Sequence, residues 1–496
     1  MNPWNLFLII CVATLMQSCA HMSKIDYINQ TKVNKKYYHV VITDDDGHQI
    51  AFTVYQPKLS QHQQAPLLLH THGFGLSRMD SPNLSLYGLI LPTGRIAKEA
   101  WNKGYWVISY DQRGHGDSAG KIRLTDPEKE AQDVITLINW AEKNLPQLSR
   151  NENGARVGMI GESYGGGVQY IASSLDARLQ AIVPITTWYD LTSSLAPNGT
   201  PKSNWIGFLN IIGDWWNWNK FDPALKQAYQ DTQKGQIHQS TYEFLKKHHA
   251  YWFCENAQPP QANAMIIQGF RDVLFPFNEA INAAKCLKTS GQKVSLIGVD
   301  GGHLQPFTQH SPFFETPIWY IGKDITCSDN KKYDLKASII NWLDNQLKDI
   351  PQTAADKLPE VCINGSPADS LSDLDASRRH TIKSTLIDIN SGEYFFLPFE
   401  RALSDIHITG TPLFNITIKI DSDIDPTIFM SLAYQSSNQH FILNEQVHPL
   451  NMSRKKQHES NIRSVGLTPH EPLSQFNEMP SINHTLKSGE VLGLLT

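Results

Sequence analysis

The chain has 496 residues, of which 41% are hydrophobic and 18% are charged. At about 150 residues per domain, this length predicts roughly three domains with a large buried core. The 43 basic and 48 acidic side chains give a formal net charge of −5 and are mixed along the sequence, so no nucleic-acid partner is expected. The composition also excludes collagen-like, coiled-coil and disordered proteins.

The N-terminus has the pattern of an export signal. Residues 4–16 are apolar and uncharged but too short for a comfortable membrane span, which is typical of the core of a signal peptide. Ser18 and Cys19 follow, and this pair resembles a bacterial lipoprotein processing site. The signal region then spans residues 1–19, and cleavage before Cys19 makes this cysteine the acylated N-terminus. Cleavage after Ala20 without lipidation is the alternative. We therefore expect an exported protein, either anchored to the membrane by a lipid or free in the periplasm or outside the cell.

Four cysteines lie beyond this signal, namely Cys254, Cys286, Cys327 and Cys362. An even number in an oxidising compartment permits two disulfides, with three possible connectivities. We expect neighbours in the sequence to pair, Cys254 with Cys286 and Cys327 with Cys362, and four buried free thiols are the alternative. None of them has CxxC spacing, so no metal site is expected.

Predicted strands and helices alternate from about residue 37 to residue 348. A hairpin is expected first, because apolar and polar residues alternate on both sides of a turn at residues 45–48. Strands then follow at 66–72, 105–110, 156–160, 181–184, 264–268 and 294–299, with helices at 94–102, at 126–144 and from 165 onward. Apolar strands separated by helices indicate a mostly parallel sheet covered on both faces, with its functional site at the carboxyl ends of the strands.

Residues 186–262 interrupt this alternation with helical and loop segments. They hold half of the 12 tryptophans of the chain, namely Trp188, Trp205, Trp215, Trp216, Trp218 and Trp252. We expect a helical cap inserted late in the sheet. Its tryptophans either fill the core of the cap or line a substrate pocket under it, and both can hold for different tryptophans.

A polar segment at residues 349–379 is expected to be a linker to a C-terminal domain at 380–496. In that domain, apolar and polar residues alternate from 414 to 420 and turn residues recur, which predicts a β-sandwich. The acidic residues 421–425 lack the glycine and the final acidic ligand of an EF-hand, so no calcium site is expected there.

The strongest catalytic signal is the sequence GESYG at residues 161–165, directly after a predicted strand and before a predicted helix. A sharp strand-to-helix turn exposes the serine, and glycines two residues to either side leave room for it. The helix that follows directs its positive N-terminal end toward developing negative charge. Ser163 is therefore the predicted nucleophile.

A serine nucleophile needs a base that is held by an acid, and in this class of fold the acid and then the histidine follow the serine along the chain. Asp272 lies just past the strand at 264–268, and His303 lies just past the strand at 294–299. We predict that Asp272 is the acid and His303 the base. Asp300 is the competing acid.

Two backbone N–H groups are expected to stabilise the oxyanion of the tetrahedral intermediate. One belongs to Tyr164, the residue after the nucleophile. The other is expected within residues 72–75 at the end of an early strand, at Phe74.

With these motifs, the chain resembles the α/β-hydrolase family of Xaa-Pro dipeptidyl-peptidases, cocaine esterase and related acylases. The match is carried by residues 72–75, 111–118, 161–165, 269–272 and 301–303. This resemblance implies a hydrolase core at residues 37–348, the inserted helical cap and a C-terminal jelly-roll-like domain. Family members often donate to the oxyanion from a tyrosine hydroxyl near the end of the early strand, whereas Phe74 has none and implies a backbone donor.

We expect an exported serine hydrolase that cleaves an ester or amide through an acyl-enzyme, without a metal or cofactor. Its substrate would be a small ester or amide or a short peptide. An Xaa-Pro dipeptidyl-peptidase is the alternative, although no acidic cluster for a peptide amine can be recognised. A non-catalytic surface binding protein is the third hypothesis, and the order Ser163, Asp272, His303 argues against it.

Overall fold

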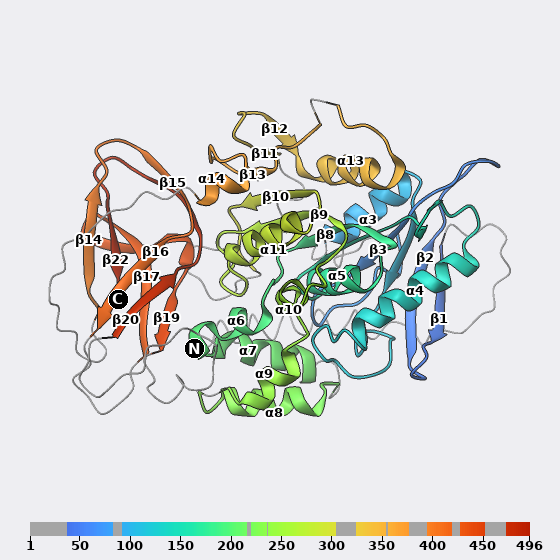
Figure 1. The fold of residues 1–496 in the computed structure, drawn as a ribbon, viewed down its shortest axis with the longest axis horizontal. Coiled ribbons are helices and arrows are strands. Elements are labelled where there is room, and N and C mark those ends of the chain that lie inside the picture. The colour runs from blue at the N-terminus through green and yellow to red at the C-terminus, as the bar shows by residue number, and fades with distance from the viewer. Residues whose placement is uncertain are drawn as a thin grey trace.

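The computed structural model describes residues 37–82, 92–215, 220–235, 237–303, 324–353, 356–375, 394–418, 427–451 and 473–496. Several residues discussed above lie outside these ranges: the export signal with Cys19, Trp216, Trp218 and the acidic residues 421–425. In Figure 1 a large sheet with helices on both sides occupies the middle and right, a group of helices lies below it, and a group of strands lies at the left.

A nine-stranded sheet forms the centre of the molecule (Figure 1), in the order β1-β2-β4-β3-β7-β8-β9-β10-β13. Its strands are β1 (Tyr37–Thr43), β2 (Gln49–Tyr55), β3 (Leu67–Thr71), β4 (Trp106–Tyr110), β7 (Val157–Glu162), β8 (Leu179–Ile185), β9 (Asn263–Gly269), β10 (Val294–Val299) and β13 (Val361–Ile363). The first two strands form an antiparallel hairpin, and β2 is also antiparallel to β4. From β4 to β13 all neighbours are parallel. The predicted hairpin and the mostly parallel sheet are both confirmed.

Helices cover both faces of this sheet. On one face lie α3 (Pro92–Asn102) and α13 (Leu335–Lys348), and on the other lie α4 (Glu130–Asn144), α5 (Tyr164–Leu175) and α11 (Phe277–Thr289). Successive residues of a strand point to opposite faces, so Leu67 and Leu69 join one hydrophobic cluster while Leu68 joins the other. This two-sided burial is why the strands are apolar almost without interruption.

Helix α4 begins at Glu130, whereas the sequence predicted a start at residue 126. The Glu130 carboxylate accepts hydrogen bonds from the backbone N–H groups of Arg123 (2.7 Å) and Asp126 (3.0 Å). The Glu130 side chain thus binds two backbone N–H groups of the segment that precedes the helix.

The chain between β8 and β9 is helical, as predicted. It contains α6 (Leu191–Leu195), α7 (Ser203–Asn210), α8 (Pro223–Thr232), α9 (Gln239–Leu245), α10 (Ala250–Glu255) and the short helical turns η1 (Pro197–Gly199) and η2 (Ile211–Trp215). We call this part the cap, and α6 to α9 are the green helices at the bottom of Figure 1. Its apolar side chains form one cluster with Tyr164 of the core, so the cap packs directly against the start of α5.

Two disulfides are present among the described residues, with the expected pairing. Cys254 of α10 is bonded to Cys286 of α11, and Cys327 is bonded to Cys362 of β13. The first therefore ties the end of the cap to a helix of the core, and the second ties an edge strand of the sheet to the segment after β11 (Asp324–Thr326).

The C-terminal part is rich in strands that pair antiparallel. One sheet contains β14 (Phe396–Arg401), β22 (Val491–Leu495), β17 (Thr427–Ser436), β18 (Gln439–Ile442) and β19 (His448–Asn451); two further pairs join β15 (Ile406–Gly410) to β21 (Ile482–Leu486) and β16 (Leu413–Ile418) to β20 (Leu473–Glu478). A short helical turn, η3 (Leu443–Glu445), lies between β18 and β19. The strand content agrees with the sequence, while a sandwich or jelly-roll arrangement remains a prediction.

The segment at 349–379 differs from the expected linker. It contributes β13 to the edge of the central sheet and contains α14 (Leu371–Asp375). The strand escaped notice because only three residues, Val361–Ile363, are apolar within a polar surrounding, yet all three are buried against the sheet. The remaining short elements are the hairpins β5 (Arg150–Asn151) with β6 (Gly154–Ala155) and β11 with β12 (Lys332–Asp334). Among the described helices, none is both long enough and apolar enough to cross a membrane.

Candidate active site

Ser163 occupies the sharp turn between β7 and α5. Its backbone is in an unusual conformation for a residue with a side chain, with φ of 52° and ψ of −113°. Gly161 and Gly165 are needed on either side, because a Cβ atom at either position would lie within 2.9 Å of Thr71, at the end of β3. The structure thus has the strained, glycine-flanked turn that the sequence GESYG predicts.

The structure brings the three predicted catalytic residues together. The Ser163 hydroxyl lies 3.1 Å from Nε2 of His303, and Nδ1 of His303 lies 2.9 Å from Oδ2 of Asp272. Ser163 and Asp272 follow the ends of β7 and β9, and His303 follows β10, so the side chains meet at the carboxyl edge of the sheet. This geometry allows His303 to take the proton of Ser163 while Asp272 orients the imidazole.

Asp272 is fully buried and hydrogen-bonded on both carboxylate oxygens. Oδ1 accepts the backbone N–H groups of Leu274 (3.0 Å) and Phe275 (2.9 Å). Oδ2 accepts the side-chain amide of Gln268 (3.0 Å) in addition to His303. These donors compensate the buried carboxyl group for its lost contact with water. The competing candidate Asp300 is exposed, whereas Asp272 is the carboxylate that contacts the imidazole.

The two predicted oxyanion donors lie on neighbouring segments beside Ser163. Tyr164 is the first residue of α5, where backbone N–H groups have no partner within the helix. Phe74 follows β3, and its ring centre lies 5.4 Å from that of Tyr164. Their role as donors remains a prediction.

Glu162, next to the predicted nucleophile Ser163, lies at the site but was not predicted from the sequence. Its carboxylate is buried, accepts the backbone N–H of Gly73 (2.9 Å) and is hydrogen-bonded by the Thr93 hydroxyl. Burial raises the pKa of Glu162 to about 7. Because Gly73 precedes Phe74, this carboxyl group fixes the loop that carries the predicted oxyanion donor. Its place inside GESYG was the signal that could have found it.

The loop that carries Asp272 is bound by side chains from two distant parts of the chain. The side-chain amide of Gln446, which follows η3, donates to the carbonyl oxygens of Phe270 (2.9 Å) and Asp272 (3.0 Å). The Lys202 ammonium in the cap donates to the next two carbonyls of the loop, at 2.7 and 2.8 Å. No local sequence pattern could have linked Gln446 or Lys202 to the site.

A cavity of about 110 Å³ opens at Ser163 and is enclosed largely by the cap. None of its described lining residues has a charged side chain. Of the cap tryptophans, Trp188 lines the cavity, and the ring of Trp205 lies 5.8 Å from that of His303. Trp252 instead packs against Phe253, and the side chain of Trp215 lies outside the described residues.

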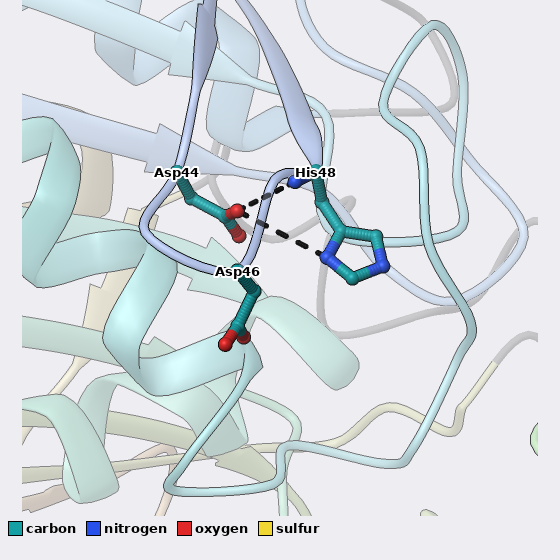
Figure 2. Close-up of side chains that lie close together, drawn as sticks. All are labelled: Asp44, Asp46 and His48. Carbon is teal, nitrogen blue, oxygen red and sulfur yellow. Dashed lines mark hydrogen bonds and ion pairs between the residues drawn. The ribbon is translucent and has the colours of Figure 1, made fainter.

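Another cluster of possible metal ligands, Asp44, Asp46 and His48, lies at the turn between β1 and β2 (Figure 2). Its carboxylates already have cationic partners, because Arg113 lies 2.5 Å from Asp44 and Lys129 lies 2.8 Å from Asp46. The Asp44 carboxylate also accepts the backbone N–H of His48 (2.6 Å), as Figure 2 shows. We interpret the cluster as a structural ion-pair network that holds the hairpin turn.

Comparison with known proteins assigns the family. A family profile described as X-Pro dipeptidyl-peptidase (S15 family) matches residues 46–305, a range that contains Ser163, Asp272 and His303. The chain belongs to the X-Pro dipeptidyl-peptidase (S15) family. This family is the one that the motifs of the sequence resemble.

Three curated relatives of this S15 family member are named as uncharacterized proteins. Two 31.7 kDa proteins of the traX-finO intergenic region of Escherichia coli are 32% identical over 153 residues, which is 30% of this chain and 47% of theirs. Protein PA2218 of Pseudomonas aeruginosa is 22% identical over 222 residues, which is 44% of this chain and 54% of that protein. The chain thus spans about half the length of the curated relatives it matches.

Solved structures extend the likeness over nearly the whole chain. A CocE/NonD family hydrolase from Staphylococcus aureus has a TM-score of 0.62 and 14% identity, with 96% of this chain and 91% of that chain covered. An α-amino acid ester hydrolase has a TM-score of 0.59 and 17% identity, with 96% and 92% covered. At these identities the likeness establishes the α/β-hydrolase-like fold.

Proposed function

We propose that this S15 family member is an exported serine hydrolase that cleaves a carboxylic ester or an amide through an acyl-enzyme. The observation that carries the proposal is the hydrogen-bonded chain from Ser163 through His303 to buried Asp272, with spacings of 3.1 and 2.9 Å. The substrate would be a small ester or amide or a short peptide.

In the first half of the reaction, Oγ of Ser163 attacks the carbonyl carbon while Nε2 of His303 takes the hydroxyl proton. Asp272 stabilises the imidazolium that forms. The N–H groups of Tyr164 and Phe74 would bind the oxyanion, and losing one such donor typically costs about 3 kcal/mol in the transition state. Collapse of the intermediate breaks the bond to the leaving group, which takes the proton from His303 and leaves an acyl-Ser163 ester.

In the second half, water attacks the acyl-Ser163 ester while His303 again removes a proton. The new tetrahedral intermediate uses the same N–H donors. Its collapse releases the carboxylic acid and returns the proton to Ser163.

The apolar cavity favours an esterase or acylase over an Xaa-Pro dipeptidyl-peptidase. A dipeptidyl-peptidase must hold the protonated N-terminus of its substrate, and a buried ammonium group needs a carboxylate partner. No aspartate or glutamate is among the described residues that line the cavity at Ser163. The dipeptidyl-peptidase remains the alternative activity, since the matching family profile has that name.

A comparison of two chromogenic substrates tests this proposal. We expect hydrolysis of p-nitrophenyl butanoate and little release of p-nitroaniline from an Ala-Pro p-nitroanilide. Ser163→Ala should abolish the ester activity, whereas Ser60→Ala, a change at an exposed serine, should retain it. Preferential cleavage of the Ala-Pro amide would establish the alternative, and ester hydrolysis that survives Ser163→Ala would overturn the assignment of the nucleophile.

Export and membrane attachment belong to the same proposal. They are supported by the apolar, uncharged residues 4–16, by Cys19 and by two disulfides, which persist mainly in oxidising compartments. Expression in a bacterium with radiolabelled palmitate should label the protein and place it in the membrane fraction. Cys19→Ser should abolish both, and label that persists in this variant would contradict lipidation at Cys19.

The antiparallel strands beyond residue 394 support a C-terminal β-sandwich, which we propose has a jelly-roll-like arrangement. An experimental structure would test this directly. Two facing sheets would support the arrangement, and a single open sheet would contradict it.

A further inference from the structure

The cavity at Ser163 extends from the nucleophile to the far helices of the cap. Its lining includes Phe74 and Tyr164 on the core side and Leu225, Ala228 and Thr241 from helices α8 and α9. A single space therefore connects the reacting serine with the interior of the cap. Its walls are formed mainly by aliphatic and aromatic side chains, and the described part includes no aspartate, glutamate, lysine, arginine or histidine.

The position of the imidazole decides which half of a substrate this cavity receives. A leaving group must lie within reach of Nε2 of His303, because it takes its proton from that atom. His303 is not among the residues that line the cavity, whereas Phe74 and Tyr164 are, and these carry the proposed oxyanion donors. Phe275 also lines the cavity, and its ring lies 5.1 Å from that of His303. Because the acyl half of a substrate needs no contact with Nε2 of His303, the cavity suits the acyl half better than the leaving group.

We propose that this cavity is the acyl-binding site and that it selects an uncharged, apolar acyl group of about four to six carbon atoms. The size follows from the volume of about 110 Å³. An apolar cavity of roughly 150 Å³ accepts benzene, with its six carbon atoms. The proposal deepens the proposed function and rests on it, since an acyl site has meaning only if Ser163 forms an acyl-enzyme.

The absence of charge from the described lining gives the cavity its selectivity. Moving an ammonium or carboxylate group from water into an apolar space is unfavourable unless a partner compensates for the lost hydration. The amino group of an Xaa-Pro substrate belongs to its acyl half, so it would enter this cavity. An acyl chain with a terminal charge should be excluded for the same reason.

A panel of p-nitrophenyl esters tests both the size and the charge preference. We expect kcat/KM to be highest for the butanoate or hexanoate and to fall for the acetate and the dodecanoate. The 6-aminohexanoate ester, which adds only a terminal ammonium group to the hexanoate, should be hydrolysed about 100-fold less efficiently. Equal rates for the charged and uncharged hexanoates, or a maximum at the dodecanoate, would overturn the proposal.

A pair of variants on one helix locates the selectivity in the cap. Ala228→Trp places a large side chain in the cavity, so the ratio of kcat/KM for hexanoate over acetate should fall about tenfold or more. Gln230→Trp introduces the same side chain at an exposed position of α8 and should leave this ratio as in the parent protein. An unchanged ratio in Ala228→Trp, in protein that remains folded by circular dichroism, would show that the acyl chain lies elsewhere.

Ligand binding to the Ser163→Ala variant tests the cavity independently of the proposed function, because binding requires no turnover. Isothermal titration calorimetry should detect hexanamide binding, and 6-aminohexanamide should bind at least about tenfold more weakly. Selective hexanamide binding in a protein whose parent cleaves neither an ester nor an amide would support the selectivity of the cavity and refute the proposed function. Ester cleavage combined with equal binding of the two amides would support the proposed function and refute the selectivity of the cavity.

Discussion

The side-chain amide of Gln446 donates a hydrogen bond to the backbone carbonyl of Asp272, at a distance of 3.0 Å. The same amide binds the carbonyl of Phe270 at 2.9 Å, and the neighbouring residue Glu445 forms an ion pair with Arg271 at 2.7 Å. The strand-rich C-terminal part of the chain thus contacts three successive residues of the loop that holds the predicted catalytic acid. These contacts support the position of the loop at Asp272.

Removing the hydrogen bonds of Gln446 should lower the rate of the reaction. Gln446→Ala leaves two buried carbonyl groups without their donor, at a cost of about 1–3 kcal/mol, and loosens the loop that holds Asp272. We expect kcat to fall roughly 10- to 100-fold while KM changes little, because the imidazole is then poorly oriented.

Steady-state kinetics on a butanoate ester would measure this effect, with Gln439→Ala, at an exposed position of β18, as the matched control. Thermal unfolding of both variants shows whether they remain folded. A folded Gln446→Ala protein with the parent value of kcat would show that catalysis does not depend on the hydrogen bonds of Gln446.

Replacing the acid should leave the fold intact and reduce catalysis strongly. Asp272→Asn keeps the size of the side chain but cannot stabilise the imidazolium, and it favours the wrong tautomer of His303. We expect kcat to fall by about 10⁴-fold at neutral pH. Asp300→Asn changes the exposed competitor and should have a small effect by comparison. A larger loss of kcat in Asp300→Asn than in Asp272→Asn would show that Asp300, and not Asp272, is the catalytic acid.

The buried carboxyl group of Glu162 should make stability depend on pH. Burial raises its pKa from the ordinary 4.5 to about 7 in the folded protein. Between these values the folded state holds a proton that the unfolded state has lost, so the free energy of unfolding falls as the pH rises. The loss between pH 5 and 8 is on the order of 3 kcal/mol for this group, at about 1.4 kcal/mol per pKa unit.

Urea unfolding at pH 5 and pH 8 measures this contribution. Glu162→Gln removes the titration while its amide oxygen can still accept the N–H of Gly73, so its stability should fall less over this range than that of the parent. Glu152→Gln, at an exposed position, should behave like the parent protein. Burial also raises the pKa values of Glu130 and Glu279. Both residues are unchanged in all three proteins, so their contributions to the pH dependence are the same in each. An identical pH dependence in Glu162→Gln and the parent would contradict the assignment.

The disulfide between Cys254 and Cys286 should contribute substantially to stability. It closes a loop between residues 32 apart in the sequence, for which chain entropy predicts a contribution of about 3–4 kcal/mol. Changing both cysteines to alanine should lower the free energy of urea unfolding by this order. Titration of thiols in the unreduced, denatured protein should find none of the four cysteines beyond residue 19, and four free thiols would contradict both bonds.

Local patterns in the sequence predicted the core of the fold and the central residues of the site. The parallel sheet follows from strands that are apolar on both faces, and Ser163 follows from two glycines that alone fit beside Thr71. The edge strand at Val361–Ile363 was missed because three apolar residues are too few to stand out from a polar segment.

Contacts between distant parts of the chain could not be predicted in this way. Gln446 is an ordinary polar residue of a strand-rich region, and Lys202 is one of many lysines. Their importance arises only because folding brings each side chain to backbone carbonyls of the loop at Asp272. Glu162 could be predicted in part. Its position beside Ser163 is visible in the sequence, but its role as acceptor for the N–H of Gly73 depends on the fold.

The central claim is that Ser163 is the nucleophile, activated by His303. It is tested most directly by treating the folded protein with a fluorophosphonate and locating the adduct by tandem mass spectrometry. The account predicts one phosphonyl group per chain on the peptide that contains Ser163, strongly slowed labelling in His303→Ala and none in Ser163→Ala. An adduct on another residue, or full labelling of Ser163→Ala, would contradict it.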